Sequence, residues 1–260
     1  MRIVSWNVNS LKARLDHVLN YCSSGEAHCL MLQELKLSDD NFPHQAFTDI
    51  GWNSVCHGQK TYNGVAILSP FEISDVTRGL PLLIPEDAQD QQARYIEASV
   101  NGFRLGAIYL PNGNPCPGPK FDYKLQWMAR LNAHAKTLLD SEMPVILAGD
   151  YNVIPQAIDC YDTTSWEGDA LWNSKSRAAF FELSNLGYTD AIRAIHPVGA
   201  QYSYWDYQAG AWPRDNGIRI DHLMLSPEAA DKLINAGVDK MPRALERPSD
   251  HTPVWVQVVA

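Results

Sequence analysis

Short apolar runs recur along the whole chain and predict a protein rich in β-strands. Several of these runs consist almost entirely of valine, isoleucine and leucine, as is typical of strands that are covered on both faces. The predicted strands are Ile3–Val8, Cys29–Leu32, Val65–Leu68, Ile96–Val100, Leu105–Leu110, Val145–Ala148, Tyr202–Tyr207, Ile218–Leu225 and Val254–Val259.

Apolar residues three or four positions apart predict helices between these strands. The predicted helices cover Leu11–Cys22, Leu125–Leu138 and Phe180–Leu186, with a fourth that opens at Ser226-Pro227-Glu228. Ser10 is the expected N-cap of the first helix. Gly187 follows the third, where a glycine suits the left-handed turn that closes a helix. Helices thus separate several, but not all, of the strands.

Strands mixed with helices predict an α/β or α+β protein. No linker or internal repeat divides the chain, so residues 1–260 are expected to form a single domain. A domain of this size buries enough surface to fold without disulfide bonds or a structural metal. Two long loops are expected, at Leu80–Gln92 and Tyr151–Lys175, and loops of such length are often functional.

The composition is that of an ordinary globular protein. Hydrophobic residues make up 45% of the chain and charged residues 20%, which argues against a disordered or fibrous protein. The formal net charge of −9 disfavours nucleic-acid binding by the surface as a whole, although a local basic patch can still bind nucleic acid. Five cysteines without a C-x-x-C pair fit free thiols in a reducing cytosol. No membrane span or signal peptide is recognisable, so we expect a cytoplasmic protein that does not enter membranes.

Polar side chains stand where the predicted strands end. They are Asn7, Glu34, Tyr109, Asn112, Asp150, Asn152, Asp221, Asp250 and His251. If these ends meet at one edge of the fold, several carboxylates converge there with amides, a phenol and an imidazole. Carboxylates held close together repel each other, so a divalent cation is their natural partner. Oxygen ligands without cysteine favour Mg²⁺, with Mn²⁺ as a substitute.

Two spacings within this set indicate specific chemistry. Asp150 and Asn152 are two positions apart and face the same side of an extended backbone, so one can handle a water molecule while the other holds a phosphate oxygen. Asp221 can orient a histidine, and His251 is a better partner than His222, because neighbours on a strand point to opposite faces. Each motif alone has a plain alternative, since Gly-Asp-x-Asn is a common turn.

Taken in order, these segments resemble the exonuclease III branch of the endonuclease/exonuclease/phosphatase superfamily. The resemblance covers residues 1–259 and rests on Ile3–Leu11, Leu32–Lys36, His57–Lys60, Gly64–Leu68, Tyr109–Gly113, Ala148–Asn152, Tyr202–Tyr207, Gly217–Asp221 and Ser249–Val254. It implies a four-layer α/β sandwich of the DNase I-like kind, in which two packed, mostly antiparallel β-sheets are flanked by helices.

The resemblance also implies a metal site. The positions that would hold the ion or lie beside it are Asn7, Glu34, Asp150, Asn152, Asp250 and His251. Glu34 would be the principal ligand, with Asn7 and Asp250 in or near the coordination shell. The number of metal ions is left open.

The same resemblance implies catalytic roles. Asp150 would sit beside the attacking water or the leaving oxygen, and Asn152 would hold a phosphate oxygen. His251, oriented by Asp221, would contact the scissile phosphate, and Tyr109 would contact the phosphate or the leaving group. Whether Asp150 or His251 is the base is left open.

The implied activity is Mg²⁺-dependent hydrolysis of DNA phosphodiesters by a monomer acting on duplex DNA. It would combine a 3′→5′ exonuclease with incision 5′ to abasic sites, and it leaves open how much 3′-phosphatase and RNase H activity accompanies them. The expected substrate contacts are Lys60, Asn112, Tyr204, Trp205 and Arg219. Tyr204 and Trp205 match the aromatic segment that lines the pocket for an abasic sugar, whereas Ile218 replaces a tryptophan of some relatives, which puts the width of that pocket in doubt.

Nine basic residues are candidates for phosphate contacts, although each is also readily explained as a solvated charge. They are Lys12, Arg14, Lys36, Lys60, Lys120, Lys124, Arg177, Arg214 and Arg219. Two other functions are alternatives to a nuclease. A phosphoesterase for lipid or inositol phosphates would use the same metal and Asp/His machinery. A non-catalytic nucleic-acid-binding regulator would have lost key carboxylates, and these are all present.

Overall fold

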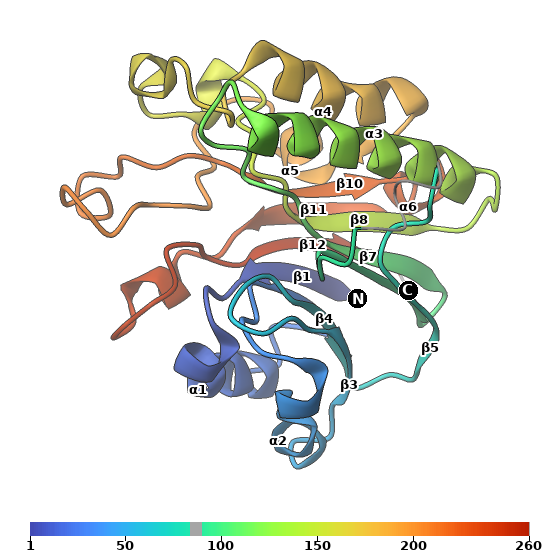
Figure 1. Ribbon diagram of the computed structural model, residues 1–260. Coiled ribbons are helices and arrows are strands. Elements are labelled where there is room, and N and C mark those ends of the chain that lie inside the picture. Colours follow the sequence, from blue (N-terminus) through green and yellow to red (C-terminus); the bar gives the residue numbers. More distant parts are fainter. Residues whose placement is uncertain (84–89, 260) are drawn as a thin grey trace.

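The computed structural model describes residues 1–83 and 90–259, and it contains two stacked β-sheets between outer helices (Figure 1). The first sheet contains, in spatial order, β11 (Leu233–Val238), β12 (Val254–Val258), β1 (Arg2–Asn7), β2 (Cys29–Gln33), β4 (Val65–Ser69) and β3 (Asn53–His57). The second contains β5 (Ile73–Arg78), β6 (Tyr95–Val100), β7 (Phe103–Tyr109), β8 (Val145–Asp150), β10 (Asp221–Leu225) and β9 (Thr189–Asp190).

Each sheet contains one parallel pair of strands, β1 with β2 and β7 with β8. The other neighbouring strands run antiparallel. The expected pair of mostly antiparallel sheets is therefore confirmed. Each parallel pair has a consequence for the site, because the carboxyl ends of its two strands lie at the same edge of the sheet.

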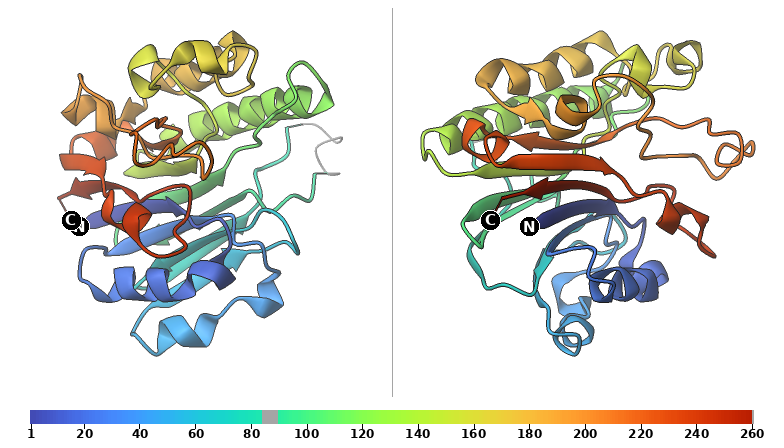
Figure 2. Two further views of the ribbon diagram at one scale, coloured as in Figure 1. Left: turned by 90° about the vertical axis from the view of Figure 1, so that its left-hand side faces the viewer. Right: turned by 180° about the vertical axis from the view of Figure 1, so that it is seen from behind.

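Helices cover the outer face of each sheet and complete the four layers (Figures 1 and 2). The first sheet is covered by α1 (Leu11–Ser23) and α2 (His44–Thr48), and the second by α3 (Pro119–Leu139) and α4 (Ser174–Leu186). Two short helices, α5 (Ala191–Ile195) and α6 (Pro227–Ala230), contribute side chains to the core between the sheets. The expected architecture is thus confirmed.

Three apolar cores follow from this layering. Met31 and Ile146 are fully buried between the two sheets. Val18 of α1 belongs to the core outside the first sheet, and Leu131 of α3 belongs to the core outside the second. Burial of one such side chain stabilises the fold by about 1.5–3 kcal/mol. These cores fix the two sheets relative to each other.

The signals that predicted the helix ends are confirmed with one exception. The side chain of Ser226 accepts from the amide of Ala229 at the start of α6, and Gly187 closes α4 with a φ of 119°. Ser10 does not cap α1 through its side chain. Its amide donates to the carbonyl of Glu34, which places the Ser10 backbone at a φ of 95° and outside the conformation of an N-cap.

The strand predictions fail where polar and apolar residues mix. The run Tyr202–Tyr207 is not a strand, and only Tyr204 forms isolated bridges. The run Ile218–Leu225 becomes a regular strand at Asp221. The strands β3, β5, β9 and β11 were not predicted, because they are short or partly exposed and lack a continuous apolar run.

Part of the expected loop Leu80–Gln92 lies outside the described residues. The loop Tyr151–Lys175 contains short 3₁₀ helices at Ala157–Asp159 and Thr163–Trp166. Among the helices that the structure describes, none has the length and apolar character needed to cross a membrane.

A buried ion network anchors this long loop to the segment that leads into β10. The guanidinium of Arg219 donates to Asp159 at 2.7 Å and to Asp190 at 2.8 Å, and Arg193 also donates to Asp159. Arg219 itself is fully buried. The expectation that Arg219 contacts the substrate is therefore corrected, because two carboxylates hold its guanidinium inside the protein.

We expect Asp159→Ala to lower the free energy of unfolding by about 3–5 kcal/mol, because it removes one of the two carboxylates that hold the buried Arg219 and the carboxylate that pairs with Arg193. Glu26→Ala is the matched control. It breaks an exposed ion pair with Arg2 and should cost at most about 1 kcal/mol. Urea unfolding of both variants measures the difference, and equal small losses would contradict the anchoring role of Asp159.

Candidate active site

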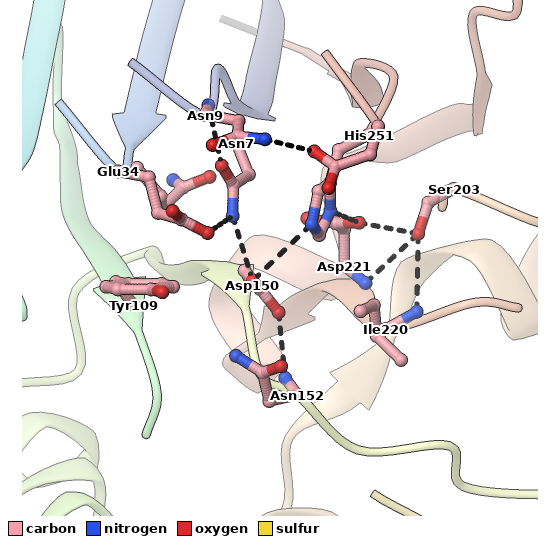
Figure 3. A network of polar contacts seen from close by, with 12 residues as sticks. Asn7, Asn9, Glu34, Tyr109, Asp150, Asn152, Ser203, Ile220, Asp221 and His251 are labelled. Atoms are coloured by element: carbon pink, nitrogen blue, oxygen red, sulfur yellow. Dashed lines mark hydrogen bonds and ion pairs between the residues drawn. The ribbon is translucent and has the colours of Figure 1, made fainter. Parts of the chain in front are cut away.

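The strand ends bring the predicted polar residues to one place. Asn7 ends β1 and Glu34 directly follows β2, and these two strands are a parallel pair. Tyr109 and Asp150 end the parallel strands β7 and β8, where they are register partners. Asp221 begins β10 and is the register partner of Asp150 on the antiparallel side. The site therefore lies across both sheets (Figure 3).

Glu34, Asp150 and His251 form the centre of the site. Each offers one ligating atom, and these atoms all lie within 4.8 Å of one another. The amide nitrogen of Asn7 joins the sheets, because it donates to Glu34 at 3.0 Å and to Asp150 at 2.9 Å. Two carboxylates and an imidazole at this spacing are a donor set that suits a divalent cation.

His251 is held by two carboxylates on opposite sides of its ring. Its Nδ1 lies 2.8 Å from Asp221 Oδ2, and its Nε2 lies 3.8 Å from Asp150 Oδ2. The hydroxyl of Ser203 donates to the same Asp221 oxygen at 2.6 Å. The expected pairing of Asp221 with His251 is confirmed. His222 instead contacts the carbonyl of Val153.

Burial and the neighbouring charges shift the pKa values of the residues in the cluster. Burial raises the pKa of the Asp150 carboxyl, against the opposing charge of His251. Burial would lower the pKa of His251, but Asp221 and Asp150 outweigh it and raise the pKa. For Glu34, burial is outweighed by the hydrogen bond from Asn7 and the charge of Lys36, so its pKa is lowered. A cation at these three residues would offset the cost of burying the Asp150 carboxylate.

The backbone of the candidate site is left-handed at two positions. Glu34 and Asn152 have φ values of 53° and 49°, in the left-handed region that residues with a Cβ rarely adopt. Gly149 allows β8 to approach β7 closely, because a Cβ there would lie 1.9 Å from the carbonyl oxygen of Ile108. The close approach of Gly149 to Ile108 and the left-handed backbone at Asn152 therefore set the shape of the turn Gly149-Asp150-Tyr151-Asn152.

Asn152 and Asn112 form a pair of amides beside the cluster. The Asn112 amide nitrogen donates to Asn152 Oδ1 at 3.2 Å. The Asn152 amide nitrogen donates to the carbonyl of Leu110 at 2.9 Å, and its backbone amide donates to Asp150 Oδ1, also at 2.9 Å. Because an amide nitrogen carries two hydrogens, Asn152 keeps one donor for a substrate oxygen.

Two aromatic residues flank the cluster. The guanidinium of Arg94 lies 4.9 Å from the ring centre of Tyr109. Burial and the charge of Glu34 raise the pKa of Tyr109, so its hydroxyl stays protonated and can donate. The ring of Tyr204 meets the ring of His251 edge to face, with 4.9 Å between centroids. Both rings lie beside the cluster, and the substrate contacts expected of Tyr109 and Tyr204 stay predictions.

Asp250 lies beside the cluster and is not part of it. Its Oδ1 accepts from the amide of Asn9 at 3.1 Å and from Ser249 at 3.4 Å. The Oδ1 of Asn7 likewise accepts from the backbone of Asn9, at 3.0 Å. Among the described His, Cys, Asp and Glu residues, only Glu34, Asp150 and His251 meet as a group of possible ligands. The expectation that Asn7 and Asp250 lie in or near the coordination shell stays a prediction.

Several residues expected at the substrate are engaged in contacts within the protein, and Trp205 is buried while Arg14 and Arg177 are partly exposed. Trp205 is fully buried and donates to Asp215, so it does not line an open pocket. Arg14 donates to the carbonyls of Asn9 and Pro248, and Arg177 stacks on a tryptophan. Lys12, Lys60, Lys120 and Arg214 are exposed. The basic surface is therefore smaller than the sequence suggested.

One buried polar residue of the site was missed from the sequence, and Lys124, a candidate for phosphate contact, is corrected to a buried residue that bonds the backbone. Ser203, which donates to Asp221, lies in a Tyr-Ser-Tyr-Trp segment that carries no signal for it. Lys124 contacts the backbone of Asn112 and Asn152, at 3.0 and 2.6 Å. The sequence did indicate that Lys124 could be buried, because it lies on the buried face of α3 between apolar residues.

Known proteins resemble this chain in sequence and in structure. A model of the Endonuclease/Exonuclease/phosphatase family matches residues 4–251. Exodeoxyribonuclease III of Haemophilus influenzae is 29% identical over 269 residues, with 99% of both chains covered. The 3′ phosphatase NExo from Neisseria, solved with a product DNA hairpin, is 42% identical with a TM-score of 0.95. An AP endonuclease from Archaeoglobus fulgidus is 32% identical with a TM-score of 0.94, and both solved chains match over their full length. The chain therefore belongs to the endonuclease/exonuclease/phosphatase family.

Proposed function

We propose that this protein is a DNA-repair nuclease that hydrolyses phosphodiesters of duplex DNA, from 3′ ends and 5′ to abasic sites. The observation that carries the proposal is the meeting of Glu34, Asp150 and His251, with ligating atoms within 4.8 Å of one another. Relatives that match this chain over essentially their full length are named as an exodeoxyribonuclease, a 3′ phosphatase and an AP endonuclease. One chain carries every residue of the site, so a monomer suffices.

The metal in this proposal is Mg²⁺, with Mn²⁺ as a substitute, and Glu34, Asp150 and His251 would hold it. Carboxylate oxygens are the ligands that Mg²⁺ prefers. When bound, such an ion stabilises negative charge on the phosphoryl group and on the leaving 3′ oxygen. Asn7 keeps the two carboxylates facing each other across the sheets.

The side chains of this protein handle the proton and the phosphate. Asp150 and His251 face each other. With Nε2 of His251 used to hold the ion, the proton of the attacking water would go to the Asp150 carboxylate. Asp221 holds Nδ1 of His251, so Nε2 points into the site. The free amide hydrogen of Asn152 and the hydroxyl of Tyr109 donate to the phosphoryl group. Phosphoryl transfer depends mainly on such positioning and on charge stabilisation.

A patch of lysines beside the cluster offers a path for the DNA backbone despite the acidic average. Lys12, Lys36 and Lys60 line one hollow of about 530 Å³. Lys36 also pairs with Glu34 at 3.0 Å, which connects this hollow to the site. Phosphates neutralised by lysine make binding sensitive to salt.

A 3′-phosphatase activity is the second candidate. It is favoured by the 42% identity to NExo, which was solved with a product DNA hairpin. Removal of a terminal 3′ phosphate needs the same cluster and the same amide donor. The 3′ oxygen leaves in both reactions, which differ in whether the phosphoryl group is a terminal monoester or a diester that joins two nucleotides.

The deciding experiment offers the protein three duplexes, with one abasic site, with a recessed 3′ end and with a 3′ phosphate. Each is incubated with Mg²⁺, with Mn²⁺ and with a chelator. We expect metal-dependent cleavage that the chelator abolishes. An inositol polyphosphate is assayed in parallel, and its hydrolysis with no action on DNA would indicate a lipid or inositol phosphoesterase. DNA binding without cleavage would indicate a regulator.

We expect Asn152→Ala to lower kcat by a factor on the order of 10²–10³, as for the loss of one donor aimed at a developing oxyanion. Steady-state cleavage of the preferred duplex measures it. Asn53→Ala is the matched control, because Asn53 donates to Phe71 at the exposed start of β3. A near-normal rate for Asn152→Ala would show that Asn152 does not donate to the phosphoryl group in the reaction.

We expect Glu34→Ala to shift the Mg²⁺ titration of the rate upward by more than about tenfold, because even residues that only support a ligand change metal affinity by about 10–100-fold. Asp250→Ala provides the comparison, since Asp250 lies beside the cluster and should shift the titration less. Identical titration curves for wild type and Glu34→Ala would show that Glu34 is not a ligand.

A further inference from the structure

Lys124 is a buried lysine placed beneath the pair of amides at the site, where burial lowers its pKa to about 7. Its side chain extends from α3 and is fully shielded from solvent. Taking a charged ammonium out of water is costly unless its hydrogens find acceptors. None of the ion pairs between described residues includes Lys124. Its nitrogen instead donates to two backbone carbonyls, those of Asn112 at 3.0 Å and Asn152 at 2.6 Å.

These two carbonyls belong to the residues whose side chains form the amide pair. Asn112 follows β7 and Asn152 follows β8, so Lys124 joins the two loops that leave the parallel strands. The side chains of the same residues are joined at 3.2 Å on the other side. Two connections, one through the backbone and one through the side chains, fix the distance between the loops.

The surrounding backbone is shaped to admit the lysine. Gly113 has a φ of 91°, and a Cβ at this position would lie 2.6 Å from Cδ of Lys124. A side chain on Gly113 would therefore collide with the lysine stem. Asn152 adopts its left-handed conformation with its carbonyl turned onto the lysine nitrogen. The site of the lysine is thus built by both loops.

We propose that Lys124 is a positioning residue that sets the Asn112–Asn152 amide pair, and through it the donor that Asn152 presents to the scissile phosphate. The lysine touches neither the substrate nor the metal ligands' side chains. Two N–H groups on the Lys124 nitrogen are enough to donate one hydrogen bond to each of the two carbonyls. The kinetic part of the test rests on the proposed nuclease function.

Lys124→Met tests the proposal, because methionine keeps an unbranched stem and removes the donors. We expect kcat to fall about 10–100-fold, since a displacement near 1 Å can cost 10² in rate, with KM changed less than about threefold. Arg104→Met is the matched control. It removes a largely buried cation that pairs with Glu97 at the far end of β7 from Tyr109, so it should lower stability and leave kcat unchanged. Equal effects of the two variants on kcat would overturn the proposal.

A double-mutant cycle separates positioning from a general loss of structure. If Lys124 acts through Asn152, then adding Lys124→Met to Asn152→Ala should lower kcat by less than about threefold further. Losses that multiply would show that Lys124 acts independently of Asn152 and would overturn the proposal.

A measurement without turnover keeps the proposal testable if the chain does not cleave DNA. The side-chain amide signals of Asn112 and Asn152 can be followed by nuclear magnetic resonance. We expect both to shift in Lys124→Met and neither to shift in Arg104→Met. Unchanged amide signals in a folded Lys124→Met protein would refute the positioning role, whereas an inactive wild type with the expected shifts would refute only the nuclease function.

Discussion

The mutual repulsion of buried carboxylates is the constraint on which the rest of this site depends. Glu34, Asp150 and Asp221 lie at neighbouring strand ends, and Asp150 and Asp221 are almost completely buried. Gathering such charges away from water costs free energy unless donors or a cation compensate. Asn7 supplies donors to Glu34 and Asp150, and His251 lies between Asp150 and Asp221. The site therefore gathers carboxylates where a bound cation would stabilise their negative charge.

The double sheet explains how one chain builds this arrangement. The two parallel pairs place Asn7 with Glu34 in the first sheet and Tyr109 with Asp150 in the second. Stacking of the sheets then brings the two edges together, and the hydrogen bond from Asn7 to Asp150 crosses between them. Because the apolar cores between and outside the sheets fix the layers, the position of the carboxylates is set by the packing of the whole domain.

Much of this could be predicted from the sequence, because apolar runs that end in a polar residue reveal strands that deliver a side chain to an edge. Asn7, Glu34, Asp150 and Asp221 were identified in this way, and the opposite faces of neighbouring strand residues selected His251 over His222. Contacts between distant segments left no such pattern. The burial of Arg219 by Asp159 and Asp190, and of Trp205 beside Asp215, depends on which loops meet in three dimensions.

The central claim is that Glu34, Asp150 and His251 share one divalent cation. Anomalous diffraction from a crystal soaked in Mn²⁺ tests it most directly, because it locates the ion without any assay of activity. The account predicts one strong peak bonded to Glu34 and within reach of Asp150 and His251, lost in crystals of a Glu34→Ala variant. A peak elsewhere on the protein, or none at saturating Mn²⁺, would contradict it.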